Sequence, residues 1–337
     1  MTGLLSRVSP QTLRLLALGL ALLATILFFA TQIDGYLSPR MFNRISTSAA
    51  VVVPVAVGQA LVIMTRNIDL SVGSTMGVVA YMTGQLLAVM PDLDPVLVVL
   101  FCMGLGALAG AINGVLVAWG RVPSIIVTLG TLALFRTFLV EWSGAKTITT
   151  ASLPQWLVDL PSAAAISVGG LDLRVTVVLA LVSCILTGLA LAWLRPARQF
   201  YAVGSNPDAA RMAGINAPRV VFSAFVLCGA LAGLSGFIFL AKFGNITVVA
   251  GMGFELKSIA AVVVGGVSIM GGSGTMFGVR LGALLVDTID NSLTRWAVVS
   301  EFWRDALLGM LIMAAVTLDT LASRQLTRMR LTKGGPQ

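Results

Sequence analysis

A series of apolar segments, each close to 20 residues long, constrains this chain more than any other feature. A helix of that length crosses the hydrocarbon core of a bilayer. Ten such spans are predicted, at about 12–33, 46–65, 70–90, 95–119, 123–140, 173–194, 220–241, 257–271, 276–292 and 304–321. Only 11% of the residues are charged, whereas a soluble domain carries about 25%. The sequence therefore predicts an all-α polytopic membrane bundle.

The distribution of basic residues predicts the orientation. When the N-terminus lies in the cytoplasm, most Lys and Arg residues between the spans fall on that side, as the positive-inside rule requires. An even number of spans then places both termini in the cytoplasm. We explain the net charge of +8 in this way, and not by binding to nucleic acid. No predicted loop is long enough to fold alone, so residues 1–337 are predicted to form a single transmembrane domain.

Several kinds of chemistry are excluded by what the sequence lacks. There is no histidine, and the three cysteines stand singly in apolar runs, so neither a metal site nor a catalytic site is predicted. The Gly-rich stretch "VVGGVSIMGGSGTMFG" (263–278) has no Gly-Lys pair and does not match a phosphate-binding loop. We interpret it as a tight turn between two helices. The chain is therefore expected not to be an enzyme and to bind no cofactor of its own.

The stretch "TRNIDLSVGSTMG" (65–77) is the most polar connection between two spans. Asp69 could cap the helix that follows it. Alternatively, this segment is a broken helix at membrane depth whose polar groups face a substrate pathway. On the second interpretation the pathway includes Asn67, Asp69, Ser71 and Ser74.

Two later spans also carry polar side chains. In 123–140, Thr128 and Thr131 either bond back to their helix or line the pathway. Arg136, near the outer end of the same span, is expected to snorkel outward, with an ion pair to Glu141 as the alternative. In 276–292, Arg280, Asp287, Asp290 and Asn291 recur, and Arg280, Asp287 and Asp290 share one helix face. Asp287 and Asn291 are candidate pathway residues, with an internal Arg280–Asp287 brace as the alternative.

Small residues at helical spacing predict close helix packing. Gly106, Gly110 and Gly114 lie four apart, and Gly229 and Gly233 repeat the spacing. Such stripes let helix backbones approach within a membrane, although they could instead line a pathway. Two similar stretches, "DLSVGS" (69–74) and "ELKSIA" (255–260), suggest an inverted repeat of five plus five spans. In the longest outward loop, "LPQWLVDLP" (153–161) is expected to form a short interfacial helix.

A short capped helix is predicted within the cytoplasmic loop 195–219. Asn206 suits the N-cap, Pro207 the first turn, Asp208 the helix dipole and Gly214 the C-terminus. A helix this short is not stable alone, so a partner protein is expected to receive it, with a solvated loop as the alternative. The predicted docking residues are Asn206, Pro207, Asp208, Ala209, Ala210, Arg211, Met212, Ala213 and Gly214.

The chain resembles the membrane permease subunits of bacterial ABC sugar importers, in the branch with ribose, rhamnose and autoinducer permeases. The matching stretches are "TRNIDLSVGS", "INGVLVAWGRVPSIIVTLGTL", "YAVGSNPDAARMAGI" and "AAVVVGGVSIMGGSGTMFGVRLGALL". "TRNIDLSVGS", with Arg66 and Asn67 where many relatives have Gly, looks closest to the rhamnose and autoinducer members.

The resemblance implies a multi-pass protein of the bacterial inner membrane, surrounded by lipid. It implies that a monosaccharide or sugar-like molecule enters through two permease subunits, identical or merely related. A periplasmic sugar-binding protein would deliver the cargo. A separate cytoplasmic ATPase subunit would bind ATP and dock onto the coupling helix at 207–213.

Two other function classes compete with this interpretation. A secondary transporter coupled to protons or ions would need ion-binding carboxylates within the membrane, and Asp69, Asp287 and Asp290 could serve. A membrane enzyme is disfavoured by the missing histidine, cysteine pair and metal cluster. The sequence does not identify the sugar.

Overall fold

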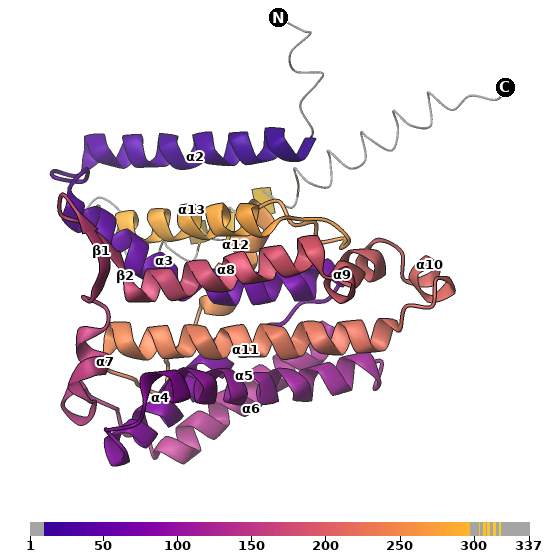
Figure 1. Cartoon of the computed structure of the whole chain (residues 1–337), viewed down its shortest axis with the longest axis horizontal. Coiled ribbons are helices and arrows are strands. Elements are labelled where there is room, and N and C mark those ends of the chain that lie inside the picture. Colours follow the sequence, from indigo (N-terminus) through magenta and orange to yellow (C-terminus); the bar gives the residue numbers. More distant parts are fainter. Residues whose placement is uncertain are drawn as a thin grey trace, which may run out of the picture.

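The computed structural model describes residues 10–296 and single positions between 303 and 317 (Figure 1). The helices are α2 (Pro10–Gln32), α3 (Pro39–Met64), α4 (Val72–Val89), α5 (Pro95–Ala118), α6 (Ser124–Ser143), the 3-10 turn η1 (Thr150–Ser152), α7 (Gln155–Asp159), α8 (Val175–Trp193), α9 (Arg195–Ser205), α10 (Pro207–Met212), α11 (Ala217–Phe243), α12 (Phe254–Val264) and α13 (Met276–Arg295). Two strands, β1 (Ala164–Val168) and β2 (Leu171–Arg174), complete the described elements. Apart from the single positions, the predicted span at 304–321 lies outside the described residues, and so do both chain termini.

Seven of the described helices are long and apolar enough to cross a membrane: α2, α3, α4, α5, α6, α8 and α11. Each coincides with a predicted span. The largest difference is at α3, which begins at Pro39 because Ser38 caps it by accepting a hydrogen bond from the backbone N–H of Met41 (3.3 Å). α13 coincides with the predicted span at 276–292. It is not among these seven helices, because its charged residues make it less apolar.

The predicted span at 257–271 is wrong as a continuous helix. α12 has 11 residues, which corresponds to about 16 Å of helix, against about 30 Å of hydrocarbon. The Gly-rich stretch ends it, because Gly266, Gly271, Gly272 and Gly274 all have positive φ, from 73° to 146°. The connection to α13 is therefore an irregular loop at 265–275, longer than the tight turn that we expected.

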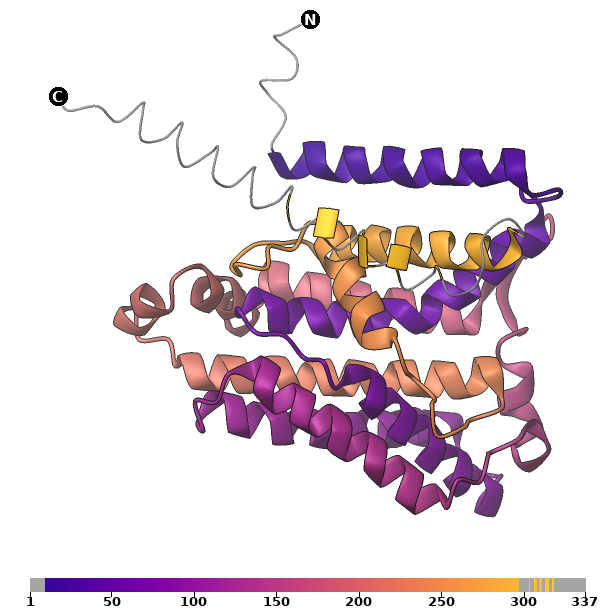
Figure 2. The ribbon, with the colours of Figure 1, turned by 180° about the vertical axis from the view of Figure 1, so that it is seen from behind.

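α3 lies at the centre of the bundle, where α8, α11, α12 and α13 pack around it (Figures 1 and 2). The apolar stretch of α3 that could cross the membrane is entirely buried, whereas only 11% of the corresponding stretch of α2 is buried. The residues of α3 suit this place, because between Ala49 and Met64 they are mostly Val and Ala. Such small side chains let neighbouring helices approach closely within a membrane.

The predicted close packing of glycine stripes is confirmed between α5 and α11. A Cβ atom added at Gly106 would overlap the carbonyl oxygen of Gly229, and one at Gly110 would overlap that of Phe225. On α11, one added at Gly233 would overlap the carbonyl oxygen of Cys102. The two backbones therefore touch directly, and the stripes serve helix association.

The two ends of the bundle differ. One end carries α9 and α10, and the opposite end carries α7, β1 and β2 (Figure 1). The all-α expectation missed this hairpin, in which Gly169 and Gly170 make the turn with φ of 59° and 84°. Asn43 of α3 anchors the hairpin, because its Nδ2 donates to Asp172 Oδ2 (2.9 Å) and its Oδ1 accepts from Asp172 N (3.0 Å).

The short helix expected in 153–161 is present as α7. Its Leu157 is fully buried, and Trp156 Nε1 donates to the carbonyl of Pro91 (3.4 Å). The inverted repeat and the cytoplasmic termini stay predictions.

Candidate functional site

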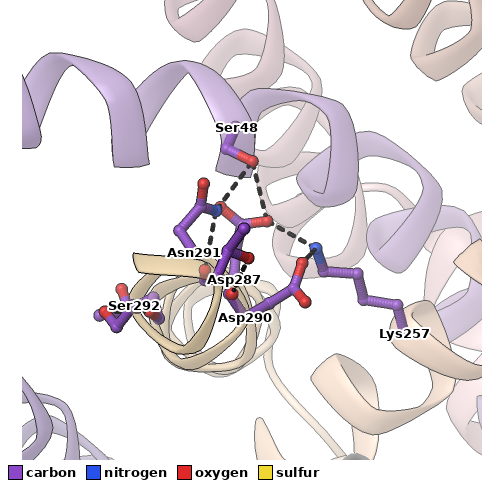
Figure 3. Close-up of polar contacts among 8 residues, drawn as sticks. Ser48, Lys257, Asp287, Asp290, Asn291 and Ser292 are labelled. Carbon is purple, nitrogen blue, oxygen red and sulfur yellow. Dashed lines mark hydrogen bonds and ion pairs between the residues drawn. The ribbon is translucent and has the colours of Figure 1, made fainter. Parts of the chain in front are cut away.

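A buried polar cluster joins α3, α12 and α13 (Figure 3). Lys257 Nζ lies 2.8 Å from Asp287 Oδ1 and 2.7 Å from Asp290 Oδ2. Ser48 Oγ donates to Asp287 Oδ1 (3.1 Å), and Asn291 Nδ2 lies 2.9 Å from Asp287 Oδ2 and 3.0 Å from Ser48 Oγ. The arrangement brings the predicted pathway residues Asp287 and Asn291 together.

Helix geometry explains why these side chains meet. Asp287 and Asn291 are four residues apart on α13 and therefore lie one above the other, and Asp290 is three residues from Asp287. Lys257 comes from the first turn of α12, which packs against both α13 and α3. α12 thus presents one ammonium group to two carboxylates of α13, and α3 adds the hydroxyl of Ser48.

The electrostatics of this cluster depend on pairing. The Asp287 side chain is 0% exposed and the Lys257 side chain 10%. Removing one partner from such a pair leaves an uncompensated buried charge, which destabilises a protein by about 3–5 kcal/mol. Asp287 is further stabilised by the hydroxyl of Ser48 and the amide of Asn291, so both carboxylate oxygens are hydrogen-bonded.

A cavity of about 340 Å³ adjoins the cluster at the end of the bundle opposite α10. Lys257, Asp290, Asn291 and Ser48 line it, so the charged groups reach its wall. The remaining lining residues are Arg44, Lys242, Phe243, Met252, Gly253, Phe254 and Thr294. The volume lies at the lower end of the range for small-molecule sites, about 300–1,000 Å³. Ammonium, hydroxyl, amide and aromatic groups together suit a small molecule with several hydroxyl groups.

The alternative Arg280–Asp287 brace is wrong. Among the described residues, Asp287 pairs with Lys257, and Arg280 lies two turns away with its guanidinium 4.9 Å from the ring of Phe277. The seven-residue separation gives about 10.5 Å of axial rise along α13, whereas Lys257 approaches Asp287 from a neighbouring helix.

Asp69 lies at the centre of a second polar network, between α3, α4, α5 and α6. Its Oδ1 accepts from the backbone N–H (2.8 Å) and the hydroxyl (2.7 Å) of Ser71. Asn113 Nδ2 donates to Ser71 Oγ (2.8 Å) and lies 3.5 Å from Asp69 Oδ2. Thr131 Oγ1 donates to Asn113 Oδ1 (2.7 Å), so the network reaches α6.

The backbone of Asp69 is also bonded. The amide of Gln59 faces the backbone of Asp69, and in the orientation that satisfies both groups it donates to Asp69 O (3.1 Å) and accepts from Asp69 N (3.2 Å), which pairs the loop 65–71 with α3. Asp69 is 1% exposed, Ser71 0% and Ser74 1%, with the Ser74 hydroxyl bonded to Ser71 O. In this conformation, the Asp69 carboxylate makes an Asx-type turn with the N-cap residue of α4 and holds the non-helical loop in shape.

Both hydroxyls predicted for the span at 123–140 are buried. Thr128 Oγ1 donates to Ser124 O (2.9 Å) and lies 3.3 Å from Ile68 O, so it both bonds back and contacts the loop beside Asp69. Asn67, from the same predicted set, donates to the carbonyl oxygen of Thr65 (2.9 Å). Whether any of these residues contacts a substrate stays a prediction.

Both expectations for Arg136 are wrong. Its Nη1 donates to the carbonyl oxygens of Val248 (2.9 Å) and Ala250 (2.7 Å). Arg136 therefore holds the non-helical segment between α11 and α12. No pattern in the sequence indicated this contact, because the apolar segments on both sides were predicted as continuous spans.

The predicted coupling segment forms the capped helix α10. Asn206 Oδ1 accepts from the backbone N–H groups of Asp208 (3.1 Å) and Ala209 (3.0 Å), and Gly214 has φ of 80°. Most of the segment is exposed, with Met212 at 85%, but Ala210 is 4% exposed and packs inward against the core. Ala210 therefore belongs to the support of α10, although we predicted it as a docking residue.

Four residues of the two networks were missed: Gln59, Asn113, Lys257 and Ser48. Lys257 had a usable signal, because an ammonium group at the start of an apolar segment is a functional candidate within a membrane. Gln59 and Asn113 lie singly in long apolar helices. A polar side chain in such a helix indicates a hydrogen bond to another helix, but the sequence does not identify the partner residue.

Comparison with known proteins places the chain in a family. The family model described as "Branched-chain amino acid transport system / permease component" matches residues 41–316. No solved structure matches the chain.

Three similar proteins are each named "Autoinducer 2 import system permease protein LsrC". The protein from Enterobacter sp. (strain 638) is 37% identical over 309 residues, covering 92% of this chain and 87% of the relative. That from Escherichia coli (strain K12 / DH10B) is 37% identical over 302 residues, covering 89% and 85%. That from Salmonella typhi is 36% identical over 304 residues, covering 89% and 84%.

Proposed function

Because the chain belongs to the family of branched-chain amino acid transport system permease components, we propose that it is the membrane subunit of an ATP-binding-cassette importer for a sugar-like molecule. The observation that carries the proposal is the 37% identity to autoinducer 2 import permeases across nine-tenths of the chain. The cargo class follows from the same relatives and from the polar cavity beside Lys257 and Asn291.

The proposed location is the bacterial inner membrane, with α9 and α10 in the cytoplasm. The basic residues Arg195, Arg198, Arg211 and Arg219 cluster around these helices, as the positive-inside rule expects of a cytoplasmic loop. The cavity at the opposite end then faces the periplasm, where a binding protein would deliver the cargo. In this arrangement α10 docks onto a separate ATPase, which binds the ATP, and a second permease completes the pathway.

The chemistry at the cavity favours a cargo rich in hydroxyl groups. Hydroxyls of the cargo can donate to the carboxylate of Asp290 and accept from the amide of Asn291 and the ammonium of Lys257. The ring of Phe254 lies 5.7 Å from Lys257 Nζ and supplies an apolar face to the same cavity. We propose that this cavity is the first membrane-embedded contact of the cargo.

Transport by the reconstituted complex tests the proposal. The permease, its ATPase and its binding protein are placed in lipid vesicles, and uptake of a labelled sugar or of autoinducer 2 is measured with ionophores that collapse all ion gradients. We expect uptake to require ATP and the loaded binding protein. Uptake that persists without ATP and stops with the ionophores would contradict the importer assignment.

One observation favours a second candidate, an ion- or proton-coupled transporter. The buried group of Lys257, Asp287 and Asp290 resembles the carboxylate clusters that bind or release protons in such proteins. The ionophore arm of the same experiment separates the two functions.

A further inference from the structure

Arg66 has an unusual backbone conformation at the end of α3. Its φ is 65°, in the left-handed region that favours glycine. Its N–H bonds to Ile63 O (2.9 Å), and the following N–H, of Asn67, bonds to Val62 O (3.2 Å). α3 therefore ends in a left-handed turn with an arginine where glycine would be less strained.

The side chain of Arg66 reaches the end of another helix. Its Nε donates to Gly204 O (2.5 Å) and its Nη2 donates to Ser205 O (2.6 Å). These carbonyls belong to the last turn of α9, where the helix lacks intrahelical donors and its dipole is negative. A guanidinium group is suited to this site because its planar fork bonds two acceptors at once.

The Gly-rich loop between α12 and α13 joins the same contact. Gly272 N donates to Met64 O (3.0 Å), and Tyr201 Oη of α9 donates to Gly274 O (3.0 Å). A Cβ atom added at Gly204 would overlap Met64 O, and one at Gly271 would lie 2.6 Å from Arg66 Cγ. Three segments that are distant in sequence thus meet with their backbones in direct contact.

Each of the three segments leads to a site already described. α9 continues into α10 through Asn206, which is the C-cap of the first helix and the N-cap of the second. The chain after Arg66 reaches Asp69 within three residues. The Gly-rich loop connects α12, which carries Lys257, to α13, which carries Asp287.

We propose that Arg66 is the positioning residue that transmits movement of α10 to the pathway, by fixing the end of α9 to the α3–α4 turn and the Gly-rich loop. This inference rests on the proposed importer function. When the ATPase moves α10, the segments before Asp69 and between α12 and α13 must move with it, because Arg66 bonds α9 to their common junction.

The test compares Arg66→Gly with Arg121→Gly. Arg121 is a matched control, since it also has positive φ (56°), lies in the connection between α5 and α6, and is exposed. Both changes relieve backbone strain and remove one positive charge, so neither is expected to prevent folding. In reconstituted complexes, we expect Arg66→Gly to lower the cargo transported per ATP hydrolysed by about tenfold, the loss expected for charge-assisted hydrogen bonds.

Three results define the outcome. Assembly with the ATPase should be retained in both glycine variants. Arg121→Gly should transport as much cargo per ATP as the unchanged permease. Arg66→Lys should recover part of the loss, because lysine can bond one carbonyl. Unchanged transport per ATP in Arg66→Gly would overturn the proposal. If the parent chain itself shows no ATP-dependent uptake, the importer function fails before any variant is compared.

A second measurement is independent of transport. Spin labels at Met212 and Met270, which are 85% and 74% exposed, report the distance between α10 and the Gly-rich loop in the permease alone. We expect the distance distribution to broaden in Arg66→Gly and not in Arg121→Gly. Equal distributions in the two variants would show that Arg66 does not hold these segments together.

Discussion

Lys257 is the single residue on which the candidate site depends most. It is bonded to two carboxylates of α13, while Asp287 is also bonded to Ser48 of α3 and to Asn291. The position of the ammonium group therefore fixes how α12 and α13 meet beside the cavity. A charge buried in this way is stable only while its partners remain.

A double-mutant cycle on Lys257 and Asp287 tests this dependence. Lys257→Met should destabilise the permease by about 3–5 kcal/mol, because it leaves two carboxylates without their ammonium partner. Asp287→Asn should cost less, because Lys257 keeps its ion pair with Asp290 at 2.7 Å. The double variant should lose less stability than the sum of the single variants. Thermal unfolding in detergent is the measurement, and additive losses would show that the two residues act separately.

Asp69 makes a different kind of contribution, because its carboxylate is occupied by Ser71 and approached by Asn113. We expect Asp69→Ala to lower both stability and uptake, since it leaves buried donors without an acceptor, at about 1–3 kcal/mol each. Asp69→Asn keeps one acceptor oxygen and should retain most of the stability. A stable Asp69→Asn variant without uptake would show that the charge itself acts in the pathway.

At the scale of elements, the bundle depends on how closely helices approach. α5 and α11 touch through glycine backbones, whereas α12 is cut short by a Gly-rich loop. Glycine thus has opposite uses here: in a helix it removes side-chain bulk, and in the loop 265–275 it permits positive φ.

Substituting two neighbouring glycines of α5 separates packing from helix propensity. Gly104 faces open space, so Gly104→Ala should be neutral or slightly stabilising, by up to about 1 kcal/mol. Gly106→Ala should destabilise by about 1–3 kcal/mol, because the added methyl group overlaps Gly229 O. Thermal stability in detergent measures both changes. Equal effects at the two positions would contradict direct contact between the helices.

At the scale of the whole molecule, the cavity is lined by the first turns of α3 and the last turn of α11. These helix ends lie at the end of the bundle opposite α10 (Figure 1). α3 runs between the two ends of the bundle, with Ser48 near the cavity and Arg66 just beyond its other end. The apolar stretch of α3 is entirely buried, and the helix packs against α8, α9, α11, α12 and α13. Such a helix is suited to connect the two ends, because it cannot move without moving its neighbours.

The exposed face of α10 is where a partner should bind. Met212→Asp should leave the permease folded and weaken ATPase binding, since the interface would then bury an unpaired carboxylate. Ala210→Asp should instead destabilise the permease itself, because Ala210 is buried. The control is Val168→Asp, a change to another exposed apolar residue (70%, against 85% for Met212) at the far end. Co-purification with the ATPase is the measurement, and retained binding by Met212→Asp would move the docking surface elsewhere.

The sequence by itself determined the membrane class, the positions of the seven apolar helices and the caps of α10. These properties depend on local composition and on residues three or four positions apart, so they can be read along the chain. The cap at Asn206 and the glycine stripes are of this kind. Asp287 and Asn291 were also found in this way, because charged and amide groups stand out within an apolar span.

Only the tertiary structure decided which residues meet. Asp287 pairs with Lys257 and not with Arg280, because α12 delivers an ammonium group closer than a residue two turns away on the same helix. Two further contacts also join segments that are distant in sequence: Arg136 binds the carbonyl oxygens of Val248 and Ala250, and Ala210 packs inward against the core. Contacts between segments distant in sequence depend on helix lengths, breaks and crossing positions, and no local pattern along a single chain contains them.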